Sequence, residues 1–447
     1  MFGRKTDVAA QDTGTRDLVV LLLLGALLIG LCALLVAFYV RPPLGTSPRL
    51  GRDADLTGFF PSFWAFLPRT PDDVAFCWRA VGFWSLLSGT FLLALFWTDR
   101  AARGPSALRV VAGVSVVAHL LFVLAPPFLC NDLLRYAVFG RMLLGPGLNP
   151  YLSPPAALVG DPLLPYANLF HVTSGYGPSF MWFSALLGWL GRGDVFWTAL
   201  LFKGAAAACS LVNCWLIRRL TLSLYGEALR PLVLYAWNPL VLLEIAGMGH
   251  NEALMVALAL GGLLLASRGR PWLGFGLLVL SADVKQVTAV MALLFAVQFV
   301  AAAPHWRGRL RRMAGLLALA AAIELVLWAP FWAGPRTFAA LETLFHPRVL
   351  VPGARSLEVG KALVFVAAVL AGAWKASRGG LKEATTLSAL LMLAFVVFVF
   401  PWRFSWYVIP PLALLAVNAQ NWRWMTAALV ALVWASYAMI PYALVHL

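Results

Sequence analysis

Long runs of apolar residues, separated by short polar segments, extend along most of the chain. A helix needs about 20 mainly apolar residues to cross a bilayer, and shorter runs occur where helices break around a cavity. On this pattern we predict about 13 membrane-spanning helices, at residues 18–40, 74–97, 108–130, 195–217, 231–249, 252–267, 271–284, 287–303, 313–333, 359–375, 384–401, 404–418 and 424–444. The predicted fold is an all-α, polytopic helical bundle that forms one domain over residues 1–447.

Two features interrupt this regular pattern. The apolar run at 178–190 is short, and counting it as a span would move the arginines at 218, 219 and 230 to the outer side, so we interpret it as an interfacial or re-entrant helix. Pro239 interrupts the run at 231–249, because proline removes a helix hydrogen bond. Polar turns at 249–252 and 282–285 add to the broken character of this region, which is typical of helices that surround a cavity.

Composition and charge support a membrane protein. The chain is 62% hydrophobic and only 12% charged, with a mean hydropathy of +0.83, which excludes an ordinary soluble domain. Its net charge of +15 is distributed unevenly: with the N-terminus inside, the cytoplasmic ends carry 19 basic and six acidic residues, so the outer side is nearly neutral. This asymmetry is a topology signal rather than a nucleic-acid surface. We expect a multi-pass protein of the cell (inner) membrane, with no nucleic-acid partner.

The longest outer loop, residues 131–177, carries the first group of chemically interesting side chains. If the chain is helical from residue 132 to 141, Asp132, Arg135 and Tyr136 share one face. An ionised carboxylate suits a general base that takes a proton from a hydroxyl, and a neighbouring guanidinium suits a phosphate held at two points. The alternative is structural, because aspartate at a helix start commonly acts as an N-cap and pairs within the helix.

Lys285 interrupts a run that is otherwise apolar from 273 to 299. A lysine in the membrane costs a few kcal/mol unless it reaches water or an anion, so it indicates a polar cavity or a bound phosphate. Alternatively, Asp283 and Lys285 form a turn whose lysine extends to the surface. Arg403 lies beside Trp406 and Tyr407, where it is a candidate for binding lipid phosphate, although the aromatic residues are also typical of an interfacial belt.

Tyr176 and His250 are further candidates for substrate contacts. Tyr176 precedes Pro178 where the long loop re-enters the apolar region, so it marks a boundary or contacts a ligand. His250 and Glu252 are two residues apart, which is not the HExxH spacing that holds zinc. The five cysteines form no CxxC pair. The sequence therefore gives no support for a metal site or a disulfide framework.

Five motifs occur in a characteristic order along the chain. They are Asp132 with Arg135-Tyr136 and Gly140, then Gly147-Leu148-Asn149-Pro150-Tyr151, then Tyr176-Gly177-Pro178, then Asn238-Pro239-Leu240 with Gly249-His250-Asn251-Glu252, and Asp283-Val284-Lys285. In this order they resemble the bacterial polyprenol-phosphate-mannose-dependent mannosyltransferases, which have the GT-C fold and include the alpha-(1->6)-mannopyranosyltransferases. The resemblance covers about residues 110–300. The chain departs from the family pattern at Glu252, where an aspartate is usual, and at Leu134, where an aromatic or polar residue is frequent.

The resemblance implies a reaction and roles for residues. It implies transfer of a sugar, mannose in this family, from a polyprenyl-phosphate donor to a glycan or glycolipid acceptor on the outer face, in one inverting displacement without a metal or other cofactor. Asp132 falls on the family's general base. The candidates for binding the donor phosphate are Arg135, Lys285, Arg403 and Arg141. The candidates for other substrate contacts are Tyr136, Asn149, Tyr151, Tyr176, His250, Asn251, Glu252, Trp406 and Tyr407.

Two other classes of function are compatible with the sequence. Broken spans between 231 and 303, together with Glu244 and Glu324 in apolar surroundings, are also typical of a secondary transporter or a lipid-linked sugar flippase. Such transporters often contain an internal repeat, and the sequence has no second copy of the Asn-Pro, His-Asn-Glu or Asp-x-Lys patterns. A non-catalytic membrane scaffold would form no product from a donor.

Overall fold

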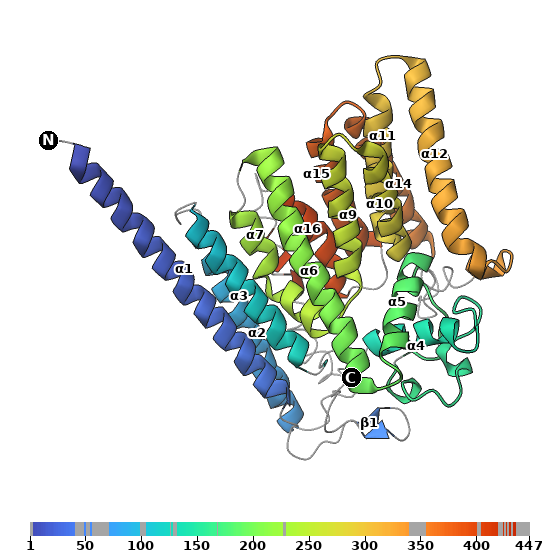
Figure 1. Cartoon of the computed structure of the whole chain (residues 1–447), viewed down its shortest axis with the longest axis horizontal. Helices are drawn as coiled ribbons and strands as arrows, with labels where there is room; N and C mark the ends of the chain where they lie inside the picture. The colour runs from blue at the N-terminus through green and yellow to red at the C-terminus, as the bar shows by residue number, and fades with distance from the viewer. Residues whose placement is uncertain are drawn as a thin grey trace.

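The computed structural model describes residues 3–40, 49–50, 54–55, 71–98, 104–125, 127, 132–167, 169–226, 229–338, 355–399, 404–418, 423, 426, 429–430 and 432–434. These residues form a helical bundle (Figure 1), which confirms the all-α prediction. Its helices are α1 (Gly3–Val40), α2 (Pro71–Trp97), α3 (Pro105–Leu124), α4 (Asp132–Leu144), α5 (Pro178–Leu190), α6 (Val195–Tyr225), α7 (Leu229–Ala236), α8 (Pro239–Val241), α9 (Glu252–Ser267), α10 (Pro271–Val284), α11 (Ala289–Ala301), α12 (Trp306–Trp328), α14 (Arg355–Ala376), α15 (Leu381–Ala394) and α16 (Ile409–Val417). The only strands among the described residues, β1 (Arg49–Leu50) and β2 (Ala54–Asp55), pair with each other.

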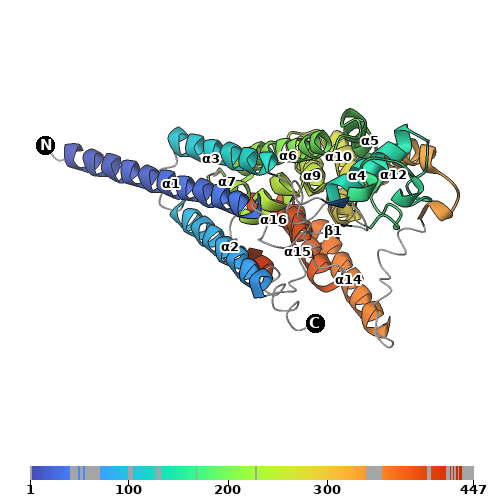
Figure 2. The ribbon, with the colours of Figure 1, turned by 90° about the horizontal axis from the view of Figure 1, so that it is seen from below.

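The helices of the bundle are arranged in groups that lie side by side. Helices α1, α2 and α3 pack together on one side of the bundle, and α10, α11 and α12 lie on the other (Figure 1). Helix α6 runs through the middle and contacts both α3 and α9. Seen from below, α2 and α14 lie to one side of the layer that holds α3, α6 and α10 (Figure 2).

Six described helices are long and apolar enough to cross a membrane. They are Thr15–Ala37, Pro105–Leu124, Val195–Tyr225, Trp306–Phe331, Val359–Ala376 and Leu381–Val399. The helices at Leu229–Ala236 and Pro239–Gly247 form one further candidate span that is bent by 45°, as predicted from Pro239. Five shorter apolar helices of 10–17 residues accompany them. The predicted number of 13 spans is therefore not confirmed, and most of the predicted span 424–444 lies outside the described residues.

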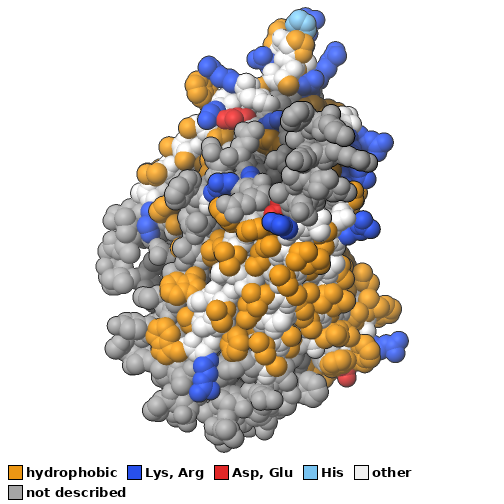
Figure 3. Space-filling model, turned by 90° about the vertical axis from the view of Figure 1, so that its left-hand side faces the viewer, with side chains coloured by type: hydrophobic (Ala, Val, Ile, Leu, Met, Phe, Trp, Pro, Cys, Tyr) orange, Lys and Arg blue, Asp and Glu red, His pale blue; other side chains and the backbone are white. Residues whose placement is uncertain are grey.

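Many large apolar side chains face outward from these helices. Leu23 of α1 is 65% exposed, and Val326 of α12 is 73% exposed. Figure 3 shows apolar side chains across the middle of one face of the molecule, with lysine and arginine side chains towards its upper edge. A soluble monomer rarely exposes an apolar surface of this extent. The exposed apolar faces thus identify the chain as a membrane protein whose helices contact lipid.

Local sequence signals explain where the helices around the site begin and end. Proline occupies the first position of α5 and α10, where its missing N–H costs no hydrogen bond. The side chain of Asp194 accepts a hydrogen bond of 2.8 Å from the Trp197 backbone N–H and caps α6. Asn238 caps α8 in the same way through the Leu240 N–H. These signals set the starts of α5, α6, α8 and α10.

Helices α4 and α5 pack closely against each other and support the site. A Cβ atom at Gly140 of α4 would collide with the Ser184 carbonyl of α5, so only glycine permits this approach. A Cβ atom at Gly177 would likewise collide with the Asp283 carbonyl at the end of α10. The side chains between these elements form a hydrophobic core separate from that of the main bundle. This second core holds the beginning of α4 beside the end of α10.

Candidate active site

The first turn of α4 carries an acidic and a basic side chain on one face. Asp132 is the first residue of the helix, and its Oδ1 lies 3.5 Å from Nη2 of Arg135. The two side chains are 10% and 11% exposed, so the pair lies at the edge of the protein interior. The predicted helix and the predicted pairing of residues three apart are both confirmed. This arrangement keeps a carboxylate next to a guanidinium in a partly dry environment.

Tyr176 connects this pair to the outer loop. Its hydroxyl accepts a 3.1 Å hydrogen bond from Nη2 of Arg135, and its ring lies edge-on to Tyr136 at 5.2 Å between ring centroids. Burial raises the pKa of Tyr176 to about 12, so the phenol is neutral at physiological pH. Nε of Arg135 is buried and has no hydrogen-bond partner among the described residues. The guanidinium therefore retains a donor that a bound anion would satisfy.

Lys285 follows α10 and lies near the same tyrosine ring. Its Nζ lies 2.5 Å from Oε1 of Glu252, 4.0 Å from the centroid of the Tyr407 ring and 5.8 Å from that of Tyr176. The guanidinium of Arg135 lies 6.0 Å from the Tyr176 centroid. Two cations from distant parts of the sequence thus meet at one aromatic ring. Both can contribute to an electropositive site for an oxyanion.

The Asp283 carboxylate does not pair with Lys285, which was the structural alternative that the sequence allowed. Its Oδ2 accepts a 2.8 Å hydrogen bond from the Ser179 backbone N–H at the start of α5, and its Oδ1 accepts one of 3.2 Å from Nε1 of Trp328. Asp283 therefore ties α5 and α12 to the end of α10. It positions the backbone around Lys285 without neutralising that lysine.

A series of buried polar side chains in contact with one another adjoins this group. Nδ1 of His250 is 3.4 Å from the Tyr136 hydroxyl, and its Nε2 is 3.2 Å from Oε2 of Glu244. Glu244 also accepts a 2.6 Å hydrogen bond from Ser405, and the His250 ring stacks on Trp406 at 4.2 Å between centroids. His250 is completely buried. These contacts join His250 to Tyr136, Glu244 and Trp406, and the substrate contact expected of His250 stays a prediction.

Two neighbouring residues retain buried polar atoms without protein partners. Neither side-chain polar atom of Asn251 forms a hydrogen bond within the described part of the chain, although the residue is only 3% exposed. The same is true of Oε2 of Glu252. Buried polar groups are normally satisfied, so an unsatisfied amide and a carboxylate oxygen side by side indicate room for a polar ligand.

Other predicted residues lie apart from this cluster. Asn149 donates to the Phe331 carbonyl at 2.8 Å and accepts from the Tyr151 N–H, and the Tyr151 hydroxyl donates to the Tyr176 carbonyl at 2.8 Å. Both residues therefore hold the outer loop in place and touch the cluster only through backbone. Arg141 pairs with Asp161 and lines a different cavity. Arg403 lies outside the described residues.

Sequence reasoning missed one buried cation. Lys203 of α6 is 1% exposed, donates to the Ala125 carbonyl at the end of α3 and packs against Gly249, next to His250. A lysine in an apolar span is costly, which is the same signal that identified Lys285. A search for every lysine within an apolar run would therefore have identified Lys203 as well. Among the described residues, no three His, Cys, Asp or Glu side chains are placed to hold a metal ion.

The region that carries this cluster matches a known family. A family model described as "Alpha-(1->6)-mannopyranosyltransferase, N-terminal domain" matches residues 69–302, more than half of the chain. The chain belongs to this family. The matched region of the alpha-(1->6)-mannopyranosyltransferase family contains Asp132, Arg135, Tyr176, Glu252 and Lys285. The resemblance inferred from the motifs is therefore confirmed.

Individual relatives in this family are similar over the same part. Alpha-(1->6)-mannopyranosyltransferase A of Corynebacterium glutamicum is 29% identical over 184 residues, which cover 41% of this chain and 37% of the relative. Its counterpart in Mycobacterium tuberculosis is 28% identical over 219 residues, covering 47% of this chain and 42% of the relative. The chain thus matches less than half the length of each relative. No solved structure matches the chain.

Proposed function

We propose that this protein is a membrane glycosyltransferase that moves mannose from a polyprenyl-phosphate donor to a hydroxyl of a glycan or glycolipid. Membership of the alpha-(1->6)-mannopyranosyltransferase family supports the transfer of mannose. The observation that carries the proposal is the convergence of Asp132, Arg135 and Lys285 around Tyr176. A carboxylate beside two cations provides both chemical groups that transfer from a lipid phosphate requires.

In the proposed reaction, Asp132 acts as the general base. It takes the proton of the acceptor hydroxyl as that oxygen attacks the anomeric carbon of the donor sugar. The bond between the anomeric carbon and the phosphate oxygen breaks on the opposite side, and its electron pair leaves with polyprenyl phosphate. A β-linked donor therefore gives an α-glycoside. The products are the extended acceptor, polyprenyl phosphate and a protonated Asp132, which returns its proton to water.

Arg135 and Lys285 hold the leaving phosphate in this scheme. Negative charge grows on the phosphate oxygen as the bond breaks, and two fixed cations in a partly dry site stabilise it more than water would. The unpartnered Nε of Arg135 provides one of the donors. Lys285 is 12% exposed at its side chain, which leaves its ammonium group within reach of a ligand. Arg403 is proposed as a further cation on the same phosphate.

The sugar is proposed to lie against Asn251 and Glu252. Sugar hydroxyls both donate and accept hydrogen bonds. They can therefore satisfy the unpartnered amide of Asn251 and the unpartnered carboxylate oxygen of Glu252. Tyr136, Trp406 and Tyr407 supply aromatic surfaces around the same point. Asn149 and Tyr151 are proposed to act indirectly, by fixing the loop that ends in Tyr176. The whole of residues 1–447 is proposed to act as one catalytic domain.

The reaction is proposed to take place on the extracytoplasmic side of the inner membrane. The support is the charge distribution: the basic excess lies at the ends that would be cytoplasmic, and Asp132 lies at the opposite ends of the helices. A lipid-linked donor is also the form of sugar that can be presented outside the cytoplasm. No metal ion or other cofactor is proposed to take part.

A comparison of donors tests the proposed function. The purified protein is incubated with a mannoside acceptor and radiolabelled mannose, supplied either as polyprenyl phosphate mannose or as a nucleotide sugar, with and without EDTA. We expect an extended acceptor with the lipid donor alone and no effect of EDTA. Product from the nucleotide sugar, or activity that EDTA abolishes and a divalent ion restores, would contradict the proposal. Movement of the lipid-linked sugar across vesicles without any product would instead identify a flippase.

A further inference from the structure

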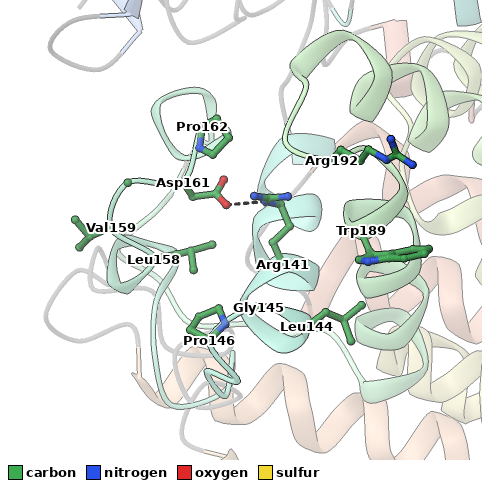
Figure 4. A pocket seen from close by; sticks show the side chains of 11 residues that line it. Arg141, Leu144, Gly145, Pro146, Leu158, Val159, Asp161, Pro162, Trp189 and Arg192 are labelled. Carbon is green, nitrogen blue, oxygen red and sulfur yellow. Dashed lines mark hydrogen bonds and ion pairs between the residues drawn. The ribbon is translucent and has the colours of Figure 1, made fainter.

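A second cavity, with a volume of about 510 Å³, lies at the far end of α4 from Asp132. Its walls come from the ends of α4 and α5, the turn between α5 and α6, and the outer loop around residue 160. Figure 4 shows Arg141 in the middle, with Asp161 and Pro162 on the loop side and Trp189 and Arg192 on the α5 side. Arg141 lies nine positions after Asp132 in the same helix, which is about 13.5 Å along the axis. The cavity is therefore distinct from the candidate active site.

The cavity carries a net positive charge. Nε of Arg141 lies 2.6 Å from Oδ2 of Asp161, whose side chain is only 5% exposed and whose Oδ1 accepts from the Leu163 N–H. This pair fixes the guanidinium but uses only one edge of it, and no described residue bonds to its two terminal nitrogens. The Arg192 backbone N–H donates to the Trp189 carbonyl, but its guanidinium has no ion-pair or hydrogen-bond partner among the described residues. Two arginines against one aspartate leave the site able to bind a phosphate.

The backbone brings the second arginine to the cavity at some cost. Arg192 has a φ of +53°, in the left-handed region that side chains other than glycine, asparagine and aspartate seldom adopt. Gly193, which follows it with a φ of +79°, packs so closely that a Cβ atom there would lie 3.3 Å from Nη2 of Arg141. The α5–α6 turn therefore folds directly over the first guanidinium and holds Arg192 at the rim of the cavity.

Apolar side chains on the rim identify the kind of phosphate. Leu144 is 51% exposed, Val159 is 89% exposed and Trp189 is 62% exposed, and all three line the cavity. Trp197, in the first turn of the spanning helix α6, is also 57% exposed. Exposed tryptophans at the end of a spanning helix are typical of the membrane–water interface. The cavity thus lies at the level of one membrane surface, with cations inside it and apolar residues around it.

We propose that this cavity binds the phosphodiester headgroup of an anionic phospholipid. The phosphate oxygens contact the terminal nitrogens of Arg141 and the guanidinium of Arg192, and the acyl chains leave over Leu144 and Trp189. A free phosphate or phosphorylated sugar would use the arginines equally well but would gain nothing from the exposed apolar rim. The lipid would brace α4 against the α5–α6 turn. The proposal does not depend on the reaction proposed for Asp132.

Native mass spectrometry of the detergent-purified protein tests this proposal. Binding of phosphatidylglycerol is compared with that of phosphatidylcholine and of soluble glycerol phosphate for the intact protein and for Arg192→Gln. We expect preferential binding of phosphatidylglycerol, and an apparent Kd about fivefold higher in Arg192→Gln, as for the loss of one cation near a lipid phosphate. Arg336→Gln, at another exposed arginine, is the matched control and should bind as the intact protein does.

Arg141 is tested without leaving a buried charge unpaired. Arg141→Gln alone would strand the buried carboxylate of Asp161, so the variant combines it with Asp161→Asn, and melting temperature reports whether it is folded. Adding Arg192→Gln to this pair removes both phosphate contacts and should raise the apparent Kd above that of Arg192→Gln alone. Unchanged binding in Arg192→Gln, an equal loss in Arg336→Gln, or glycerol phosphate binding as tightly as the lipid would each overturn the proposal.

Discussion

Replacing Lys285 by methionine removes the cation that faces Glu252. The Glu252 side chain is completely buried, its Oε1 lies 2.5 Å from the Lys285 ammonium and its Oε2 has no hydrogen-bond partner among the described residues. Lys285→Met therefore leaves a buried carboxylate with nothing to compensate its charge. Breaking a buried ion pair in this way costs about 3–5 kcal/mol of stability. The double replacement Lys285→Met with Glu252→Gln leaves no charge unpaired and should cost no more than about 1 kcal/mol.

Activity should respond differently from stability in these two variants. If Lys285 binds the leaving phosphate, its loss removes a charged contact worth about 2–5 kcal/mol, so kcat/KM for the lipid donor falls by at least about 30-fold. That loss should persist in the double variant, because the second replacement restores electrostatic balance but restores neither the cation nor the carboxylate that is proposed to contact the sugar. Stability and catalysis can thus be separated at one pair of residues.

Two measurements on the same purified preparations check this expectation. Melting temperature should fall strongly in Lys285→Met and recover in the double variant, while donor-dependent transfer should stay low in both. Thr386→Ala, a replacement of a half-buried residue on α15 whose side chain makes only a bond within its own helix, serves as the control for handling and detergent. Recovery of transfer together with stability would refute the reasoning, because Lys285 would then serve only to neutralise Glu252.

Three further predictions concern packing and pH. Gly177→Ala should lower the melting temperature, equivalent to about 1–3 kcal/mol, because its Cβ would collide with backbone of α10, whereas Gly113→Ala, with open space around it, should be neutral or slightly stabilising. Burial raises the pKa of Tyr176 to about 12, so its contribution to stability is complete below about pH 10 and is lost as the pH rises towards 12; the thermal stability of Tyr176→Phe should fall less over that range. Lys203→Met should raise the melting temperature, because it removes a buried amine that has no ion-pair partner among the described residues; a fall would show that the amine has a structural role.

Local features of the site were predictable from the sequence. The helix that starts at Asp132 and its pairing with Arg135 follow from helical spacing alone, since residues three apart are neighbours. The break at Pro239 follows from the hydrogen bond that proline cannot make. In both cases the cause lies within a few residues of the effect.

Contacts between distant segments were not predictable in the same way. The partner of Lys285 is Glu252, across two helices, and the ring that joins it to Arg135 comes from Tyr176 in the outer loop. Periodicity identifies which residues share a helix face but not which faces meet. The spacing suggested that Asp283 would pair with Lys285, yet its carboxylate is better satisfied by backbone and indole N–H groups on other helices.

The predicted number of about 13 spans is not confirmed, because some of the predicted spans correspond to shorter helices. Hydropathy recognises apolar runs but does not distinguish a helix that crosses the membrane from a shorter one buried among other helices. Helices α9, α10 and α11 belong to the shorter apolar helices of 10–17 residues. Helix α12 is longer at its start than the apolar run predicts. It begins at Trp306 rather than at residue 313, because its first turns contain arginines that a search for apolar residues leaves out.

The central claim is that Asp132 is the general base of a sugar transfer, and a single comparison tests it most directly. Transfer from polyprenyl phosphate mannose to a mannoside acceptor is measured for the intact protein and for Asp132→Asn, which keeps the size of the side chain and removes its basicity. The account predicts a loss of about 10²- to 10⁴-fold in kcat in a protein that still folds, with a lower melting temperature from the lost pairing with Arg135. Unchanged transfer by a folded Asp132→Asn protein would contradict it.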